Sequence, residues 1–322
     1  MSQYFTYNNY LSDQYLGMNE IETCENKSIQ KYIIYKGTGG LIHNLRGLSF
    51  AIKIAIEQKR ILIIDMNKNP AFGTSFSRFF DVNIPGLVYF DNYNYIPTDL
   101  YYFEIPLEVI KNSSIKWENT DLYYFEIPKW ENNVGYFLKT YIVYNRNISD
   151  KQQVVVYAGT GGTGDFHKYL FNIKINANYY RQLMDEIPIK SKYISVHFRN
   201  TDIQNNIYNY ITKIQQIINE TGINNMYLAT DDHNAYDIFK QNLKNVVIHR
   251  KNIPPKVEKN LHHEEKNKEK LFYSLILDMF FILKSDYFVP SINSGVSKIL
   301  IQMIEKNKYF FPNMNSYTKI VK

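Results

Sequence analysis

Cysteine is nearly absent from this sequence, which contains a single one, Cys24, among 322 residues. One cysteine forms no intramolecular disulfide and no multi-cysteine zinc site, and it fits a reducing compartment. Long apolar runs are absent as well, since no stretch reaches the roughly 18 apolar residues of a membrane-spanning helix. The segment from Met1 to Lys31 is rich in Tyr, Asn and Glu and lacks the apolar core of a signal peptide. We therefore expect a cytoplasmic protein without a membrane span, or a chain trimmed of its leader.

Concentrated charge of one sign is also lacking. The chain has 37 Lys and Arg against 31 Asp and Glu, a net charge of +6 that is spread along its length. This balance suits a small polyanion such as a nucleotide diphosphate better than a long nucleic-acid track, so nucleic acid is not an expected partner. With 45% hydrophobic and 21% charged residues, the chain can bury a substantial core and is long enough for two domains.

The first half of the chain has the pattern of a strand, a helix and a second strand. Residues 31–35 and 60–65 are short apolar runs, and residues 41–58 carry apolar side chains at helical spacing. A β-branched run at 153–158 closes this half, and the order of elements is typical of a parallel sheet. The glycine-rich loop at 159–164 that follows is interpreted either as a nest of amides for an anion or as a flexible turn between domains.

The second half alternates strands and helices more regularly. Strands are expected at 192–197, 226–228, 246–248 and 287–290, and helices at 206–218, 233–243, 268–283 and 295–305. A doubly wound sheet of this kind presents the carboxyl ends of its strands along one edge, where α/β proteins bind ligands. His197 ends the first of these strands, and Arg199 follows it. Ser294 and Gly295 precede the last helix, where free amides and the helix dipole favour a phosphate.

The polar residues at this edge have more than one interpretation. The planar guanidinium of Arg199 fits phosphate oxygens. In the alternative interpretation, Arg199 forms an ion pair with a carboxylate and His197 is an ordinary hydrogen-bonded core histidine. Asp231 and Asp232 follow the next strand. Adjacent carboxylates point in different directions, and no third oxygen ligand is placed by spacing, so they cap the next helix or support the site rather than hold a metal. The cluster at 262–265, His-His-Glu-Glu, lacks metal-ligand spacing and is interpreted as a solvated loop.

Three segments match one family in order and spacing over residues 37–304. Residues 197–202, His-Phe-Arg-Asn-Thr-Asp, are similar to a His-[Ile/Val]-Arg-Arg-[Thr/Gly]-Asp motif, with Asn200 replacing the second arginine. Residues 278–298 are similar to Asp-x-x-x-Leu-Ser-x-x-Asp-x-Leu-Val followed by Ser-Ser-x-x-Ser-Arg. Residues 39–47 are similar to a Gly-x-Gly-[Asn/Asp]-x-Leu loop, with Ile42 and His43 at the altered positions. The chain thus resembles the fucosyltransferase superfamily of α-1,6-, nodulation, protein O- and xyloglucan fucosyltransferases.

The resemblance implies an α/β fold of the GT-B type, with two Rossmann-like domains facing a cleft. An acceptor domain is expected at 1–165 and a nucleotide-sugar domain at 166–322. The resemblance further implies an inverting, metal-independent enzyme without a cofactor, which moves fucose from GDP-fucose to a hydroxyl of a glycan or protein acceptor. Two alternatives stay open. One is a glycosyltransferase with another nucleotide-sugar donor, and the other is a protein that binds GDP or a nucleotide sugar without catalysis.

The family motifs also imply roles for individual residues. Arg199 is expected to neutralise the departing diphosphate, while His197 and Asp278 contact the guanine. Ser294 and Gly295 are expected to hold the β-phosphate. The motif at 39–47 adds further expected donor contacts, at Gly40, His43, Asn44 and Arg46.

The catalytic base is not assigned by these motifs. The acceptor hydroxyl needs a group that takes its proton as the new bond forms. Asp202 follows the arginine motif and Asp165 follows the glycine-rich loop, so these two carboxylates are the candidates.

The middle of the chain, residues 72–142, has weaker periodicity and contains a duplication. The segment Thr98–Pro106 recurs unchanged as Thr120–Pro128. Two copies are too few for a solenoid, which needs about three repeats to bury a continuous core. We interpret the region around 90–135 as a surface insertion with a recent tandem duplication. The alternative is an acceptor platform on which Trp117 or Trp130 stacks against sugar rings.

Overall fold

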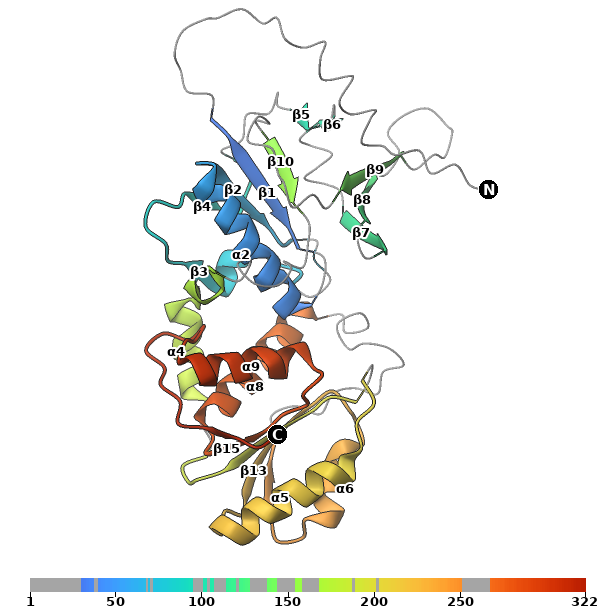
Figure 1. The fold of residues 1–322 in the computed structure, drawn as a ribbon, viewed down its shortest axis with the longest axis vertical. Helices are drawn as coiled ribbons and strands as arrows, with labels where there is room; N and C mark the ends of the chain where they lie inside the picture. Colours follow the sequence, from blue (N-terminus) through green and yellow to red (C-terminus); the bar gives the residue numbers. More distant parts are fainter. Residues whose placement is uncertain are drawn as a thin grey trace, which may run out of the picture. The chain divides into compact units, whose positions relative to one another are not determined.

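Two parallel β-sheets organise the part of the chain that the structure describes (Figure 1). A computed structural model describes residues 30–37, 40–67, 69, 72–94, 154–157, 168–186, 189–200, 203–250 and 267–322, and the backbone of short strands between 101 and 143. Residues Lys31–Lys322 belong to one compact unit. None of the helices in these ranges combines the length and the apolar character needed to cross a bilayer.

The N-terminal sheet has four parallel strands in the order β10-β1-β2-β4. They are β1 (Tyr32–Lys36), β2 (Ile61–Asp65), β4 (Tyr89–Phe90) and β10 (Val154–Tyr157). Helix α2 (Leu41–Glu57) connects β1 to β2 and packs against both. Gly37 follows β1 where a Cβ atom would lie only 2.6 Å from Asn44 Oδ1 and 2.7 Å from Met66 Sδ. A larger residue at this turn would therefore force the side chains of Asn44 and Met66 to move.

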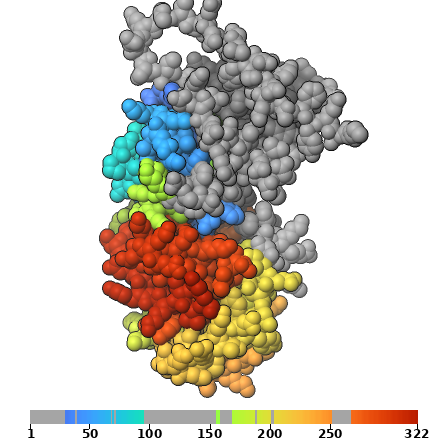
Figure 2. Space-filling view, in the orientation of Figure 1, coloured from blue at the N-terminus to red at the C-terminus, as the bar shows by residue number. Residues whose placement is uncertain are grey.

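The C-terminal sheet has five parallel strands in the order β14-β13-β12-β15-β16. The strands are β12 (Ile194–Phe198), β13 (Asn225–Thr230), β14 (Val247–His249), β15 (Tyr287–Val289) and β16 (Lys319–Ile320). Its helices are α5 (Ile207–Thr221), α6 (Ala235–Asn242), α8 (Lys268–Lys284) and α9 (Gly295–Lys306). On the face drawn in Figure 2, residues of α9 and the C-terminus (red) border residues around α5 (yellow).

Alternate residues of β12 contact different helices. Ile194, Val196 and Phe198 belong to the apolar cluster formed with α5 and α6. Ser195 and His197 point to the opposite face, where they bond to side chains beside α8 and in α9. Figure 1 shows these two pairs of helices on opposite sides of the strands. The polar side chains of β12 therefore lie together on the face that α8 and α9 cover.

Short elements that the sequence did not predict link the two sheets. They are η2 (Phe76–Arg78), β3 (Phe80–Val82), η4 (Leu170–Asn172), β11 (Ile173–Ile175) and α4 (Ala177–Asp185), with β3 and β11 antiparallel. Asn176 caps α4, because its Oδ1 accepts a hydrogen bond from Tyr179 N at 2.8 Å. Its Nδ2 donates to the backbone oxygens of Ser77 and Arg78. One asparagine thus starts the helix and attaches it to η2.

The structure confirms the predicted α/β class with parallel sheets, and every strand and helix predicted in the second half is present. The element ends differ by a few residues, as at β13, which extends from Asn225 to Thr230. The predicted domain boundary at 165 lies outside the described residues. The cleft between two domains stays a prediction.

The two copies of the duplicated nonapeptide differ in backbone structure. In the first copy, β5 (Tyr101–Tyr102) pairs with β6 (Ile105–Pro106) as a short antiparallel hairpin. In the second copy, β8 (Leu122–Ile127) is the middle strand of an antiparallel sheet with β7 (Ser114–Asn119) and β9 (Leu138–Val143). The role of this insertion as an acceptor platform stays a prediction.

Candidate functional site

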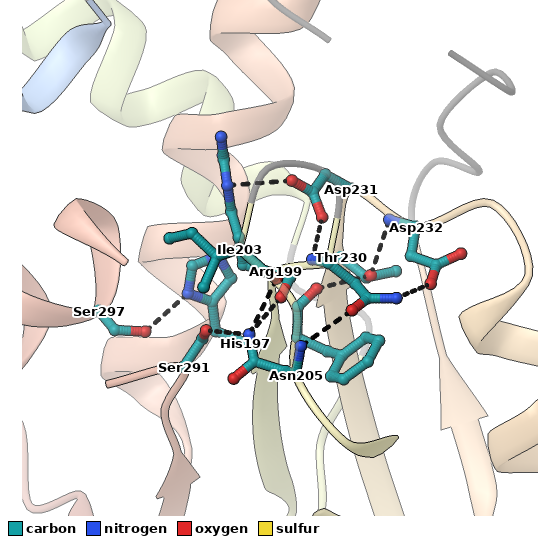
Figure 3. A network of polar contacts seen from close by, with 11 residues as sticks. His197, Arg199, Ile203, Asn205, Thr230, Asp231, Asp232, Ser291 and Ser297 are labelled. Atoms are coloured by element: carbon teal, nitrogen blue, oxygen red, sulfur yellow. Dashed lines mark hydrogen bonds and ion pairs between the residues drawn. The ribbon is translucent and has the colours of Figure 1, made fainter. Parts of the chain in front are cut away.

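An arginine and an aspartate meet where β12 and β13 end (Figure 3). Arg199 Nε lies 3.1 Å from Asp231 Oδ2, and the two side chains are mostly buried, with exposed fractions of 22% and 11%. Figure 3 shows the guanidinium extending past Asp231 and away from the strands. The carboxylate of Asp231 therefore contacts the guanidinium at Nε and orients it.

Hydrogen bonds to the side chains of Asp231 and Asn205 fix the backbone around this pair. Asp231 Oδ1 accepts a hydrogen bond from Asn200 N at 2.8 Å. Asn205 Nδ2 donates to the backbone oxygen of Arg199 and, at 3.1 Å, to Ser291 Oγ just after β15. The residues that follow three neighbouring strands are thus joined by one network (Figure 3).

Asp231 and Asp232 have different partners, as the two sequence interpretations allow. Asp231 pairs with Arg199, whereas Asp232 Oδ1 accepts from Asn234 N at 2.8 Å, directly before α6. Asp232 Oδ2 also accepts from Asn200 Nδ2 at 2.7 Å. Among the residues described, no group of three His, Cys, Asp or Glu side chains could hold a metal ion. One aspartate supports the arginine and the other supports the start of the helix.

His197 is buried on the face of β12 that packs against α8 and α9, with an exposed fraction of 8%. Its Nδ1 lies 2.7 Å from Ser297 Oγ. Burial, and secondarily the charge of Arg199, lowers the pKa of His197 to about 3. The imidazole is therefore neutral near pH 7, and it can bind a ligand as a hydrogen-bonding group but is a poor proton acceptor.

Asp278 of α8 is turned towards β13, where its Oδ1 accepts a hydrogen bond from the hydroxyl of Tyr227 at 2.7 Å. Its other oxygen accepts no hydrogen bond from the described part of the chain. Burial raises the pKa of Asp278 to about 7, while the Tyr227 hydrogen bond and the charge of Arg250 oppose this rise. The carboxyl group consequently changes its charge within the neutral pH range.

The N-terminus of α9 lies beside the same strand ends. Ser291 and Ser297 are fully buried, and Ser294 has an exposed fraction of 2%. The N-cap Ser294 makes no side-chain capping bond, and a Cβ atom built on Gly295 would meet no atom within 4 Å. Amides in the first turn of a helix lack intrahelical partners and attract anions. Gly295 leaves space for an anion to approach them.

The donor contacts expected from the motif at 39–47 lie at the start of α2. Gly40 is its N-cap and, like Gly295, faces open space. His43 is exposed, whereas Asn44 is buried and its backbone oxygen accepts from Tyr35 OH at 2.8 Å. Arg46 is half-buried, and its Nε has no hydrogen-bond partner in the described part of the chain. Helix α2 contacts α9.

Other predicted features lie outside the described residues. These are the two candidate bases, Asp165 and Asp202, together with the glycine-rich loop at 159–164 and the cluster at 262–265. The proton acceptor therefore stays a prediction.

The structure adds three residues that sequence reasoning did not place in the site. Tyr227 bonds to Asp278, Ser297 to His197, and Asn205 to the backbone of Arg199. Two of them carried a signal. Tyr227 is a hydroxyl-bearing residue in an otherwise apolar strand, and Ser297 is part of the serine-rich segment 291–298. No feature of the sequence indicated the role of Asn205, because this role depends on the path of a loop.

Together these groups suit a ligand with an anionic part and a planar polar part. A guanidinium of fixed direction and the amides at the start of α9 can neutralise an anion. The carboxyl group of Asp278 can accept hydrogen bonds from donors on the edge of a planar ring.

Comparisons with known proteins bear on the fold. By sequence the chain matches no protein-family model and no curated protein. By structure it is similar to POFUT1 in complex with GDP-fucose, with a TM-score of 0.57 and 12% identity, over 92% of this chain and 99% of that one. For POFUT1 in complex with GDP, the TM-score is 0.54 and the identity 12%, over 91% of this chain and 98% of that one. For fucosyltransferase NodZ from Bradyrhizobium, the TM-score is 0.50 and the identity 14%, over 84% of this chain and 92% of that one. The chain therefore has the fold of the fucosyltransferases, in agreement with the resemblance of its three motifs.

Proposed function

We propose that this protein is a glycosyltransferase that moves fucose from GDP-fucose to a hydroxyl of a glycan or protein acceptor, with inversion and without a metal ion. One observation carries the proposal, the Arg199 side chain that Asp231 orients, together with the start of α9 and the half-buried carboxyl group of Asp278. The shared fold with POFUT1, whose structure contains GDP-fucose, gives this arrangement a matching donor.

In the proposed reaction the acceptor oxygen bonds to C1 of fucose while the bond from C1 to the β-phosphate oxygen breaks. The electron pair of that bond leaves with GDP, and charge builds on the diphosphate. Arg199, the hydroxyl of Ser294 and the amide of Gly295 neutralise it, which replaces the function of a metal ion. His197 and Asp278 bind the guanine.

The proton of the acceptor hydroxyl passes to a carboxylate in this proposal, either Asp165 or Asp202. His197 is unsuited to take it, because its pKa is lowered to about 3 by burial and by the charge of Arg199. We assign His197 to binding.

A donor panel measured with EDTA present tests this function. The protein is incubated with GDP-fucose, GDP-mannose or UDP-glucose and a mixture of oligosaccharide and glycopeptide acceptors, and product masses and nucleotide release are recorded. We expect fucosylated product from GDP-fucose at a rate that chelation does not change. Strict dependence on added Mg²⁺ or Mn²⁺, or a preference for UDP-glucose, would contradict the proposal. Binding of GDP without turnover of any donor would indicate the non-catalytic alternative.

Base selectivity should depend on pH through Asp278. Guanine presents two adjacent donors, N1–H and N2–H, that an ionised carboxylate accepts together, and uracil presents no such pair. Because the pKa of Asp278 is raised to about 7, protonation below this value removes one acceptor. We expect GDP to bind at least roughly tenfold more tightly than UDP at pH 8, and the ratio to shrink severalfold by pH 6, as measured by calorimetry.

The control for this prediction is Asp278→Asn, which keeps the shape of the side chain but does not titrate. Its GDP-to-UDP ratio should be lower and independent of pH. The folded protein holds the Asp278 proton at pH values between the ordinary carboxyl pKa and about 7, whereas the unfolded chain does not. The contribution of Asp278 to the free energy of unfolding therefore falls as pH rises through this window. In the Asp278→Asn variant this part of the pH dependence of stability should be absent. Equal affinities for GDP and UDP at pH 8 would show that Asp278 does not bind guanine.

A further inference from the structure

A polar cavity of about 530 Å³ lies where η2, α4 and the start of α8 meet. Its volume falls within the roughly 300–1,000 Å³ of small-molecule sites. None of the residues assigned to the donor site lines it. Its walls are mostly polar, and they include Arg78, Asn178, Tyr179, Gln182, Glu269 and Tyr273.

Contacts between its three walls make the cavity a fixed feature. Asn176 attaches α4 to η2 through hydrogen bonds from its Nδ2 to the backbone oxygens of Ser77 and Arg78, at 3.0 and 2.9 Å. Arg78 bridges η2 to α8, because its Nε and Nη2 both donate to Glu269 Oε1, at 3.0 and 2.7 Å. These contacts join the three elements that line the cavity.

One buried hydroxyl in the wall has no partner. Tyr179 has an exposed fraction of 7%, and its hydroxyl makes no hydrogen bond within the described residues. Its ring is packed edge-on against Phe79 and Tyr273, with centroids 5.0 and 5.5 Å away. Buried hydroxyls are normally hydrogen-bonded, and leaving one unpaired is unfavourable. A ligand in the cavity would supply the missing partner.

The surroundings of this hydroxyl place it among the cavity groups. Burial raises the pKa of the Tyr179 phenol, the neighbouring Tyr273 and Glu269 raise it further, and the charge of Arg78 opposes them. All three neighbours line the cavity. Tyr179 itself lines the cavity, so its phenol lies among the groups that form the cavity wall.

We propose that this cavity binds a neutral saccharide, with the Tyr179 hydroxyl as one of its hydrogen-bond partners. Arg78 is paired with Glu269, which leaves Lys270 as the one further charged side chain of the lining, and most of the lining is uncharged and polar. The side-chain amides of Asn178 and Gln182 offer donors and acceptors together, which suits a ligand rich in hydroxyl groups. The ring of Tyr273 adds an apolar surface for a sugar ring. Assigning the saccharide to the acceptor glycan rests on the proposed transferase function, whereas binding itself does not.

Binding is tested on the full chain without any donor, so that a failure of fucose transfer leaves this test intact. Lactose, cellobiose and N,N′-diacetylchitobiose are titrated separately, with saturation-transfer difference NMR and calorimetry as readouts. We expect at least one of them to bind saturably, and Tyr179→Phe to weaken it about threefold to tenfold. Tyr180→Phe is the matched control, because Tyr180 lies next in α4, packs against Phe280 and Phe311, and does not line the cavity.

Two further measurements separate binding from folding and from the donor site. Tyr179→Phe should melt at the same temperature as the unchanged protein or higher, because the hydroxyl makes no bond within the described residues. The exposed Gln182→Ala should also weaken saccharide binding, and it does not disturb the core. Saturating GDP should leave the saccharide affinity unchanged. The proposal is overturned if no saccharide binds, if Tyr179→Phe binds as tightly as Tyr180→Phe, or if GDP displaces the saccharide.

Discussion

Replacing Arg199 with alanine is expected to lower the turnover of fucose transfer about 100-fold, the scale of losing one donor that stabilises developing charge. The guanidinium is directed by Asp231, with Nε 3.1 Å from Oδ2. As the bond to the diphosphate lengthens, negative charge grows on the leaving group, and a cation fixed in advance stabilises the transition state more than the bound donor. Steady-state assays with GDP-fucose should therefore show a larger fall in kcat than rise in KM.

Two variants show whether geometry or charge matters at this position. Arg199→Lys keeps the charge but loses the planar fork and the Nε contact, so it should recover little activity. Lys244→Ala removes an exposed positive charge just after α6 and should leave turnover unchanged. A folded Arg199→Ala protein with near-normal kcat would remove Arg199 from the mechanism.

The second large effect concerns stability. Lys36 and Asp65 form an ion pair at the ends of β1 and β2, with side-chain exposed fractions of 5% and 4%. Tyr93 OH donates to Asp65 Oδ2 at 2.6 Å. Removing the carboxylate leaves a buried ammonium group without this counter-charge. Asp65→Ala should therefore lower the free energy of unfolding by about 3 kcal/mol or more, as measured by urea denaturation.

An exposed ion pair in the same half of the chain provides the control. Lys53 and Glu57 lie on α2 with 3.8 Å between Nζ and Oε1 and with the glutamate half exposed, so Glu57→Ala should lower stability by less than about 1 kcal/mol. The double variant Lys36→Met with Asp65→Leu should recover much of the loss, because no charge remains buried. An equal, small effect of Asp65→Ala and Glu57→Ala would show that the buried pair does not stabilise the sheet.

The second half of the fold could be predicted because its periodicities are undisturbed. The run around Val196 is apolar on one face and polar on the other, and the prediction of a strand at 192–197 corresponds to Ile194–Phe198. The helix predicted at 268–283 is observed at Lys268–Lys284. The placement of Arg199 at the carboxyl edge of the sheet then followed from topology alone, because all five strands are parallel.

Partners across the chain could not be predicted in this way. Tyr227 and Asp278 are 51 residues apart, and their contact depends on the rotation of α8 about its axis. Sequence gives no reason for Asp231, rather than Asp232, to face the arginine, because the choice depends on how the chain turns after β13. The strands β3 and β11 have three residues each, too short for a period to be recognised.

The repeated nonapeptide has a consequence for how this chain folds. Identical residues form a short hairpin at β5 and β6 in one copy and the middle strand β8 in the other. Local preference is the same in both, so the neighbours β7 and β9 decide the outcome. During folding the first copy offers β7 and β9 a segment of the same sequence as the native middle strand, and pairing with it would give a sheet of wrong connectivity. The duplication thus builds a competing topology into the sequence, and the short connection between β7 and β8 favours the second copy because a short loop costs less entropy to close.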